Sequence, residues 1–292
     1  MKKGAELHRT KLTNDLMHYI YEHIDTPINL DTLSADFKIS KFHMHRLFKQ
    51  EFGRNIHETI QSIRLQMAAN LLITNKKSTI SKIAAMTGYG SQTSFIRAFG
   101  KKFAMSPKAW RNGGYIDYAN SIVKAVADNL TSDARYEHLS PVIKKMPTFK
   151  VYYIRHRGYD DGIKPCWQKL QAFTLSNNIQ HYSQIALYHD NPIITALDEC
   201  HYVACIAINE PFDAERVPLP SFEIHGGVYA EFSATGYRND ILKLIRWVYH
   251  VWLPSSGYET TARHTYLIYD DNDYLNETGY FSLKFYIPIV LP

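Results

Sequence analysis

The sequence contains few cysteines and no long apolar run. Its three cysteines, Cys166, Cys200 and Cys205, are odd in number and form no Cys-x-x-Cys pair. This argues against a disulfide framework and a zinc site, and favours buried thiols, with a redox sensor as the alternative. No stretch of 18 apolar residues occurs, and no apolar segment of a secretory signal follows the basic start of the chain. We therefore expect a soluble, cytoplasmic protein without membrane contact.

Familiar catalytic patterns are also missing. No Ser/His/Asp spacing, Cys-His pair or phosphate-binding loop stands out. The 14 histidines are scattered, and the close pair His43 and His45 is expected on a helix surface rather than around a metal. The sequence therefore favours a protein that is not an enzyme and has no cofactor, catalytic residue or metal site.

Charge and aromatic residues divide the chain into two unlike parts. The net charge is +5, but residues 1–112 carry 18 Lys or Arg against 8 Asp or Glu, whereas residues 113–292 carry 15 against 20. Of the 21 tyrosines, 18 follow residue 112. A basic part joined to an acidic one indicates a module that binds a polyanion, fused to a second domain.

The basic part contains one pattern twice. Leu30-x-x-Leu33-Ser-Ala matches Ile80-x-x-Ile83-Ala-Ala at an offset of 50 residues. Further matches, Ser40 to Ser91 and Arg46 to Arg97 among them, lie at an offset of 51, so one extra residue falls in the turn near Gly88. Each copy predicts a short helix, a turn and a second helix.

Capping residues and apolar spacing define the four helices. Asn29 or Asp31 caps the first, Ser40 and Ser91 cap the second helix of each copy, and Gly53 ends one of them. Gly88 allows a positive φ in the second turn. The expected core residues of the second helices are Met44, Leu47, Phe48 and Phe52, and Phe95, Phe99 and Phe103.

The opposite stripe of each second helix faces outward. It holds Phe42, His45, Arg46 and Lys49 in the first copy, and Thr93, Ile96, Arg97 and Lys101, with Gln92 before them, in the second. This pattern predicts two helix-turn-helix units that place these helices in DNA major grooves. Arginine can bind guanine, glutamine adenine, and an exposed apolar side chain a thymine methyl, whereas lysines suit phosphates. The alternatives are a solvated face for the cations and the core for Phe42.

A long helix from Ile56 to Thr74 is predicted between the copies. As a rigid spacer, it would hold the two reading helices about 34 Å apart, so that one chain enters two successive major grooves. Duplication would then replace the dimer that such proteins usually need.

Residues 1–112 resemble the DNA-binding domain of the AraC family of transcription regulators. The resemblance lies in the stretch from Ile83 to Phe103 and in the closing Ser106-Pro107-x-x-Trp110-Arg111, where tyrosine is usual in place of Trp110. It implies base contacts by Phe42, His45, Arg46, Gln92, Thr93 and Arg97, although His45 stands where relatives often have glutamine. The complete set of candidate DNA-binding residues is Lys41, Phe42, His45, Arg46, Lys49, Ser91, Gln92, Thr93, Ile96, Arg97 and Lys101.

Residues 113–133 are expected to be a linker, with Tyr118, Ile122, Val126 and Leu130 at helical spacing. Residues 134–292 predict an α+β domain with mostly antiparallel sheet. Strand-like segments that end in Gly158-Tyr159 and Gly236-Tyr237, 78 residues apart, are each followed by a helix, with Trp167 in one and Trp247 in the other. This spacing indicates two pseudo-repeated β-α-β-β units.

This domain resembles the GyrI-like effector-binding domains in residues 201–208, 224–232 and 285–289. The resemblance implies an aromatic cleft between the repeats that takes amphipathic or cationic small molecules. One departure is Leu267, at a position where many sensing members carry glutamate; Glu210 and Glu231 are the candidate substitutes. The candidate effector-binding residues are Tyr153, Trp167, Glu210, Tyr229, Glu231, Trp247, Leu267 and Tyr269, with sheet packing as the alternative for each tyrosine.

Together these features predict a transcription regulator that binds double-stranded DNA, acts as an activator and responds to a small molecule, with RNA polymerase as a further candidate partner. An adaptor is the alternative, in which the second domain binds a protein rather than a small molecule. Hydrolysis of small electrophiles, proposed for some GyrI-like proteins, is a third alternative that no residue pattern supports.

Overall fold

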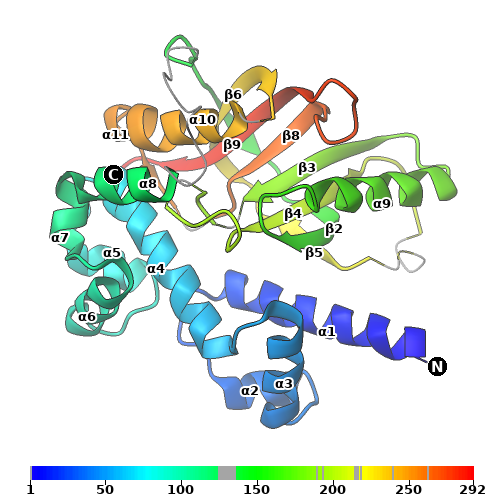
Figure 1. Cartoon of the computed structure of the whole chain (residues 1–292), viewed down its shortest axis with the longest axis horizontal. Coiled ribbons are helices and arrows are strands. Elements are labelled where there is room, and N and C mark those ends of the chain that lie inside the picture. Colours follow the sequence, from blue (N-terminus) through cyan, green and yellow to red (C-terminus); the bar gives the residue numbers. More distant parts are fainter. Residues whose placement is uncertain are drawn as a thin grey trace.

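The computed structural model describes residues 2–123, 136–188, 190–192, 194–213, 217, 219–238, 240–261 and 263–292. A helical N-terminal part is followed by a curved sheet that carries two longer helices (Figure 1). No helix in these described ranges has the length and apolar character needed to cross a membrane. The two-part architecture, all-α followed by α+β, confirms the predicted fold class.

The N-terminal part is entirely helical. Its elements are α1 (Lys2–Glu22), α2 (Leu30–Asp36), α3 (Lys41–Phe52), α4 (Ile56–Thr74), α5 (Ile80–Met86), α6 (Gln92–Phe103), α7 (Pro107–Ala109), the π-helical turn η1 (Trp110–Gly114) and α8 (Tyr115–Val123). The repeated pattern thus forms α2–α3 and α5–α6, with the predicted spacer helix α4 between them. Helix α1 was not predicted, although its buried side carries Leu16, Met17 and Ile20 at helical spacing beside the polar Thr13 and Asn14.

The two copies share their turn and cap geometry. Lys38 and Gly88, 50 residues apart, both have positive φ, at 53° and 74°. Ser40 and Ser91 accept hydrogen bonds from the backbone amides of His43 and Ser94, each at 3.2 Å. The extra residue of the second turn therefore lies after Gly88, between it and the cap, and leaves the following helix intact.

Each copy has its own apolar core, and α4 contributes to both. The first core joins Leu33, Met44 and Phe48 to Ile56 and Ile60 at the start of α4. The second joins the predicted Phe95, Phe99 and Phe103 to residues 65–73 of α4. Trp110 closes this second core, because its indole Nε1 donates to the Ala69 carbonyl of α4 at 3.0 Å.

The described part of the predicted linker begins with a kink. Gly113 has a φ of 114°, and α8 follows directly. Tyr118 packs on Trp110 at a ring distance of 5.1 Å, so this end of the linker is attached to the second core. Val126 and Leu130 lie outside the described residues. The predicted boundaries at residues 112 and 134 stay predictions.

The C-terminal part is built on antiparallel strand pairs. Its elements are β1 (Val142–Met146), β2 (Phe149–Arg157), α9 (Ile163–Ser176), β3 (Tyr182–Tyr188), β4 (His201–Ile208), β5 (Ser221–Ile224), β6 (Gly227–Tyr237), α10 (Asp240–Trp247), η4 (Val248–Trp252), α11 (Leu253–Ser255), β7 (Glu259–Thr260), β8 (Tyr266–Asp271) and β9 (Tyr280–Val290). The strand order is β1-β6-β9-β8-β3-β4-β2-β5, with β7 on β9. The units β2-α9-β3-β4 and β6-α10-β8-β9 have the same order, and β3 pairs with β8, which confirms the predicted pseudo-repeat.

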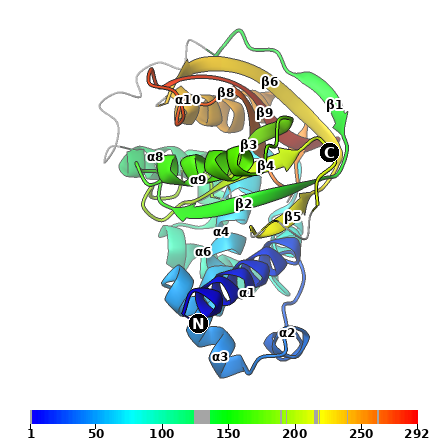
Figure 2. The ribbon, with the colours of Figure 1, turned by 90° about the vertical axis from the view of Figure 1, so that its right-hand side faces the viewer.

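The pseudo-repeat extends to the edges of the sheet. Strand β1, just before the first unit, pairs with β6 of the second, and β5, just before the second unit, pairs with β2 of the first. Helices α9 and α10 cover one face, with Trp167 and Trp247 in its core. Helix α1 lies on the opposite face, near β5 (Figures 1 and 2). There the Phe222 ring of β5 lies 5.2 Å from the His18 ring of α1.

Buried polar contacts join the two parts of the chain. The Asn75 side chain donates to the Thr260 carbonyl and accepts from the Thr260 amide, both at 3.0 Å. Glu259 accepts from the Ser78 amide at 3.1 Å and from its hydroxyl at 2.9 Å. Ile194 of the C-terminal part is buried in the second helical core. Strand β7 therefore holds the segment that leads directly into α5.

Gly88 provides a test of the turn geometry. A Cβ at this position would lie 2.6 Å from the Ile24 carbonyl oxygen and 2.7 Å from the Arg64 guanidinium, whose Nε donates to that carbonyl. With the added cost of a left-handed φ, we expect Gly88→Ala to lower the free energy of unfolding by about 2 kcal/mol. Gly90→Ala is the matched control, because its Cβ would meet no atom within 4 Å. Urea unfolding with equal losses for both variants would contradict this account.

Candidate DNA-binding surface and effector site

Helix α3 presents the first set of predicted DNA-binding residues. Ser40 caps it and Gly53, with a φ of 72°, ends it, while Met44, Leu47 and Phe48 are buried on its inner side. On its outer side Lys41, Phe42, Arg46 and Lys49 are exposed and His45 is half-buried. Phe42 is 78% exposed, so the alternative of a core phenylalanine is wrong.

Helix α6 repeats this arrangement. Phe95, Phe99 and Phe103 face inward, and Ser91, Gln92, Thr93, Ile96, Arg97 and Lys101 are all exposed. Ile96 is 39% exposed. Each helix thus displays one large apolar side chain and one exposed arginine. The arginines occupy equivalent places, whereas Phe42 corresponds to Thr93 and Ile96 to His45. In Figures 1 and 2 both helices lie on the side of the N-terminal part that faces away from the sheet.

A pair of histidines connects α3 with the start of α4. The rings of His45 on α3 and His57 on α4 are 6.0 Å apart. Partial burial, then His57 and Lys41, lower the pKa of His45. His45 is therefore neutral at pH 7 and presents one donor and one acceptor nitrogen, whereas Arg46, whose Nη2 lies 3.0 Å from His43 Nδ1, carries the positive charge. The outward face of α3 thus offers both neutral and cationic donors.

Four of the predicted effector-binding residues lie on the helix-covered face of the sheet or on its helices. Trp167, Trp247, Leu267 and Tyr269 belong to one buried core. The Trp167 Nε1 donates to the Tyr202 hydroxyl at 3.0 Å, and its ring meets Tyr269 edge-on at 5.7 Å. Leu267 is fully buried, so it packs the core where a glutamate would need a charged partner.

Tyr153, Tyr229 and Glu231 lie on the opposite face. There Tyr266 stacks on Tyr286 at 4.9 Å and meets Tyr229 at 5.4 Å. Glu231 accepts from the Tyr286 hydroxyl at 2.6 Å and from Lys144 Nζ at 2.7 Å. Burial alone would raise the pKa of Glu231, but these two hydrogen bonds outweigh it and lower the pKa. We call Tyr229, Tyr266, Tyr286, Glu231 and Lys144 the tyrosine cluster.

The eight predicted effector residues therefore do not gather at one place. Glu210, the other candidate acid, accepts from the backbone amides of Gln180 and His181 at 3.0 and 3.2 Å and fixes a loop. The structure separates these residues because side chains of successive strand residues point to opposite faces of a sheet. Only Tyr229 and Glu231 belong to the tyrosine cluster.

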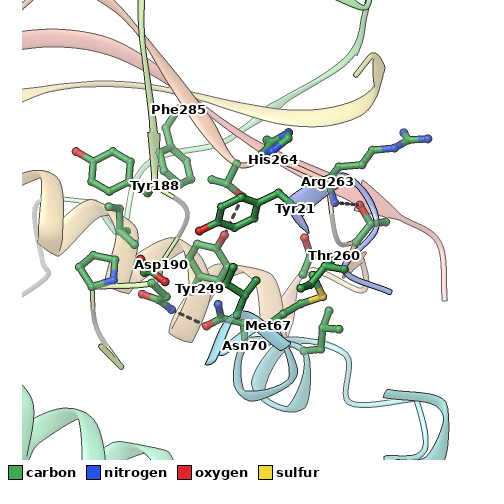
Figure 3. A pocket seen from close by; sticks show the side chains of 18 residues that line it. Tyr21, Met67, Asn70, Tyr188, Asp190, Tyr249, Thr260, Arg263, His264 and Phe285 are labelled. Atoms are coloured by element: carbon green, nitrogen blue, oxygen red, sulfur yellow. Dashed lines mark hydrogen bonds between the residues drawn. The ribbon is translucent and has the colours of Figure 1, made fainter. Parts of the chain in front are cut away.

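A pocket of about 100 Å³ lies between the two parts of the chain. Figure 3 shows that its lining comes from α1 with Tyr21, from α4 with Met67 and Asn70, and from the C-terminal part with Tyr188, Asp190, Tyr249, Arg263, His264 and Phe285. The Asn191 Nδ2 donates to Asn70 Oδ1 at 2.7 Å along its edge. None of these residues was among the predicted sites, because only the fold brings α1 and α4 against the second domain.

Known proteins match both parts of the chain. Residues 139–290 match the GyrI-like small molecule binding domain, and residues 33–113 match a helix-turn-helix domain. The regulatory protein SoxS of Escherichia coli strain K12 is 34% identical over 102 residues, which are 35% of this chain and 94% of SoxS. The right origin-binding protein of the same strain is 34% identical over 100 residues, which are 34% of this chain and 34% of that protein.

Among solved structures, the C-terminal domain of AraT, a response regulator from Geobacillus stearothermophilus, is 28% identical with a TM-score of 0.33. The match covers 35% of this chain and 84% of that domain.

His250 makes the contact between the two parts sensitive to acid. Its ring lies 5.0 Å from Tyr115 of α8, and burial, followed by Arg246, lowers its pKa to about 4. Between pH 6.5 and 4 the unfolded chain binds a proton at this residue that the folded chain does not, so stability falls as pH drops through this window.

We expect His250→Phe to reduce this acid-dependent loss by on the order of 2 kcal/mol, measured by urea unfolding at pH 7 and pH 4.5. His181→Phe, at an exposed histidine, is the control and keeps the full loss. Identical pH dependence in both variants would show that His250 does not carry the effect.

Proposed function

The chain belongs to the GyrI-like family and to the AraC-type helix-turn-helix transcription regulators, and we propose that α3 and α6 bind one DNA duplex together. The observation that carries this proposal is the exposed pair of an apolar side chain and an arginine on each helix, Phe42 with Arg46 and Ile96 with Arg97. Exposed large apolar side chains suit thymine methyl groups, and the two arginines, which occupy equivalent places in the repeat, suit guanine.

The two helices are held by one rigid element. Helix α4 runs for 19 residues, or about 28 Å at 1.5 Å per residue, and is packed into both cores. This length is close to the separation of successive major grooves on one side of DNA. Lys41, Lys49 and Lys101 flank the reading residues and suit phosphate contacts, which fix the register.

We also propose that the protein activates transcription. The proposed role is activation, with RNA polymerase as a further partner on the bound DNA, and it would be carried out in the cytoplasm. A small molecule bound by the second domain would act through the contacts of β7 with residues 75–78, which lie next to α5.

We propose that the tyrosine cluster is the place where an amphipathic or cationic effector is recognised. It combines stacked aromatic rings with an ionised acid, the chemistry of cation binding. The Tyr266 hydroxyl is buried and has no hydrogen-bond partner among the described residues, so it is left to bind an additional polar group. Lys144 currently neutralises Glu231, so a cationic ligand competes with an internal cation.

Arginine substitutions test the DNA interface. Once a duplex has been selected from random sequence with the purified protein, Arg46→Ala and Arg97→Ala should each weaken binding about 10- to 100-fold, because each removes a pair of hydrogen bonds to a base. Fluorescence anisotropy at several salt concentrations gives the affinities, which should fall steeply with salt. Lys164→Ala, an exposed cation of α9, is the matched control. If neither arginine mattered more than Lys164, the proposed surface would be wrong.

The internal cation provides a test of the tyrosine cluster. Lys144→Gln frees Glu231, so the affinity for lipophilic cations should rise about tenfold, whereas Glu231→Gln should remove the preference for cations over neutral amphiphiles. Quenching of tryptophan fluorescence across a panel of both ligand types measures the affinities. If neither substitution changed the affinities, the effector would bind elsewhere. If no ligand changed the fluorescence, the protein-binding adaptor would be favoured.

A further inference from the structure

A second cavity, of about 260 Å³, lies between the N-terminal helices and strand β2. Asn14 of α1 and Glu51 and Phe52 at the end of α3 form one wall. Tyr153 and Arg155 of β2, with Leu219 and Pro220, form the other. We call it the Arg155 cavity. Its walls belong to both domains, and its residues lie outside the tyrosine cluster.

Arg155 is held in place but is not saturated with hydrogen bonds. Its guanidinium carbon lies 5.7 Å from the ring centre of Tyr21 and 5.6 Å from that of Tyr153. Burial raises the pKa of Tyr153, and the charge of Arg155, together with a hydrogen bond from its side chain to Tyr153, only partly offsets this rise. The buried Nε and Nη1 of Arg155 donate to no acceptor of suitable geometry in the described part of the chain. Burying such charged donors without acceptors costs free energy, and an anion that accepts hydrogen bonds from them would remove this cost.

Asn14 also lines this cavity, and it offers an unused hydrogen-bond acceptor instead of unused donors. It is 6% exposed, and its Nδ2 donates to the Thr10 carbonyl at 2.8 Å. Its Oδ1 is buried and receives no hydrogen bond from any described residue. One cavity therefore holds both unused donors on a cation and an unused neutral acceptor. A ligand that satisfies both must carry an anion and a hydrogen-bond donor.

Charge and size narrow the ligand class. Arg155 and Arg157 line the cavity together with one carboxylate, Glu51, which lies 3.9 Å from the guanidinium of Arg9. The remaining wall includes the apolar Phe52, Leu219 and Pro220. Since a cavity of about 150 Å³ holds benzene, a cavity of 260 Å³ holds a molecule of about ten heavy atoms.

We propose that the Arg155 cavity binds a small carboxylate that also carries a hydroxyl or amino donor, of the size of a hydroxybenzoate. Its carboxylate accepts from Arg155, its donor group binds Asn14 Oδ1, and its carbon frame packs against Phe52 and Leu219. This goes beyond the proposed function, because the site is separate from the tyrosine cluster and selects the opposite charge. A ligand bound here contacts the end of α3 and β2 at once, so it ties the first reading unit to the sheet.

Isothermal titration calorimetry of the full chain with 2-, 3- and 4-hydroxybenzoate tests the proposal. At least one of them should bind with a Kd below about 1 mM, and its neutral amide and unsubstituted benzoate should each bind about tenfold more weakly, because each lacks one of the two polar groups. Failure of all three to bind with a Kd below about 1 mM, or an amide that binds as tightly as its carboxylate, would overturn the proposal.

Variants locate the site. Arg155→Gln should weaken carboxylate binding about tenfold or more, and Asn14→Leu should remove the advantage of the hydroxyl group. Lys150→Gln, an exposed cation on the same strand, is the matched control, and Glu231→Gln of the tyrosine cluster should also leave the affinity unchanged. A folded Arg155→Gln protein with unchanged affinity would refute the site. If that variant fails to fold, the comparison of carboxylate with amide on the unaltered protein decides.

Discussion

The packing of a single helix, α4, underlies every other relation in this structure. Its first residues, Ile56 and Ile60, complete the core of the first helix-turn-helix unit, and its later residues, from Leu65 to Ile73, complete the core of the second. At its carboxyl end, Asn75 is fully buried against β7 of the effector domain. Because side chains in such cores are closely packed, the helix cannot shift toward one core without losing contacts in another. The distance between the reading helices is therefore set by buried apolar surface, not by a flexible connection.

In the proposed regulation, the same packing would transmit the effect of a bound ligand to the DNA-binding surface. The effector domain contacts the N-terminal part at places next to each reading unit: β7 holds residues 75–78 before α5, and β2 faces the end of α3 across the Arg155 cavity. These contacts include buried hydrogen bonds whose loss would leave unpaired polar groups, so they favour one defined arrangement. A ligand that changed either contact would, in this proposal, act directly on the placement of one recognition helix. Regulation of this kind depends on the different affinity of the ligand for two arrangements.

The fold was predictable where local signals were strong. Serine caps, the 50-residue repeat and the apolar spacing of α4 specify the helix-turn-helix units, and alternating strands around Gly158 and Gly236 specify the pseudo-repeat. Candidate DNA residues could be chosen because outward stripes follow from helical spacing alone. The effector residues could not, because which sheet face a tyrosine joins depends on strand register and on distant partners. Residues such as Arg155 and Asn14 gave no sequence signal at all, since their unused hydrogen-bonding groups become visible only when α1 meets β2.

The central claim is that one chain reads two successive major grooves through helices fixed by α4. Hydroxyl-radical footprinting of a selected duplex, combined with sedimentation to determine stoichiometry, tests it most directly. The account predicts two protected stretches about one helical turn apart on the same side of the duplex, with one protein chain bound per duplex. A single protected stretch per chain, or two stretches that require two chains, would contradict it.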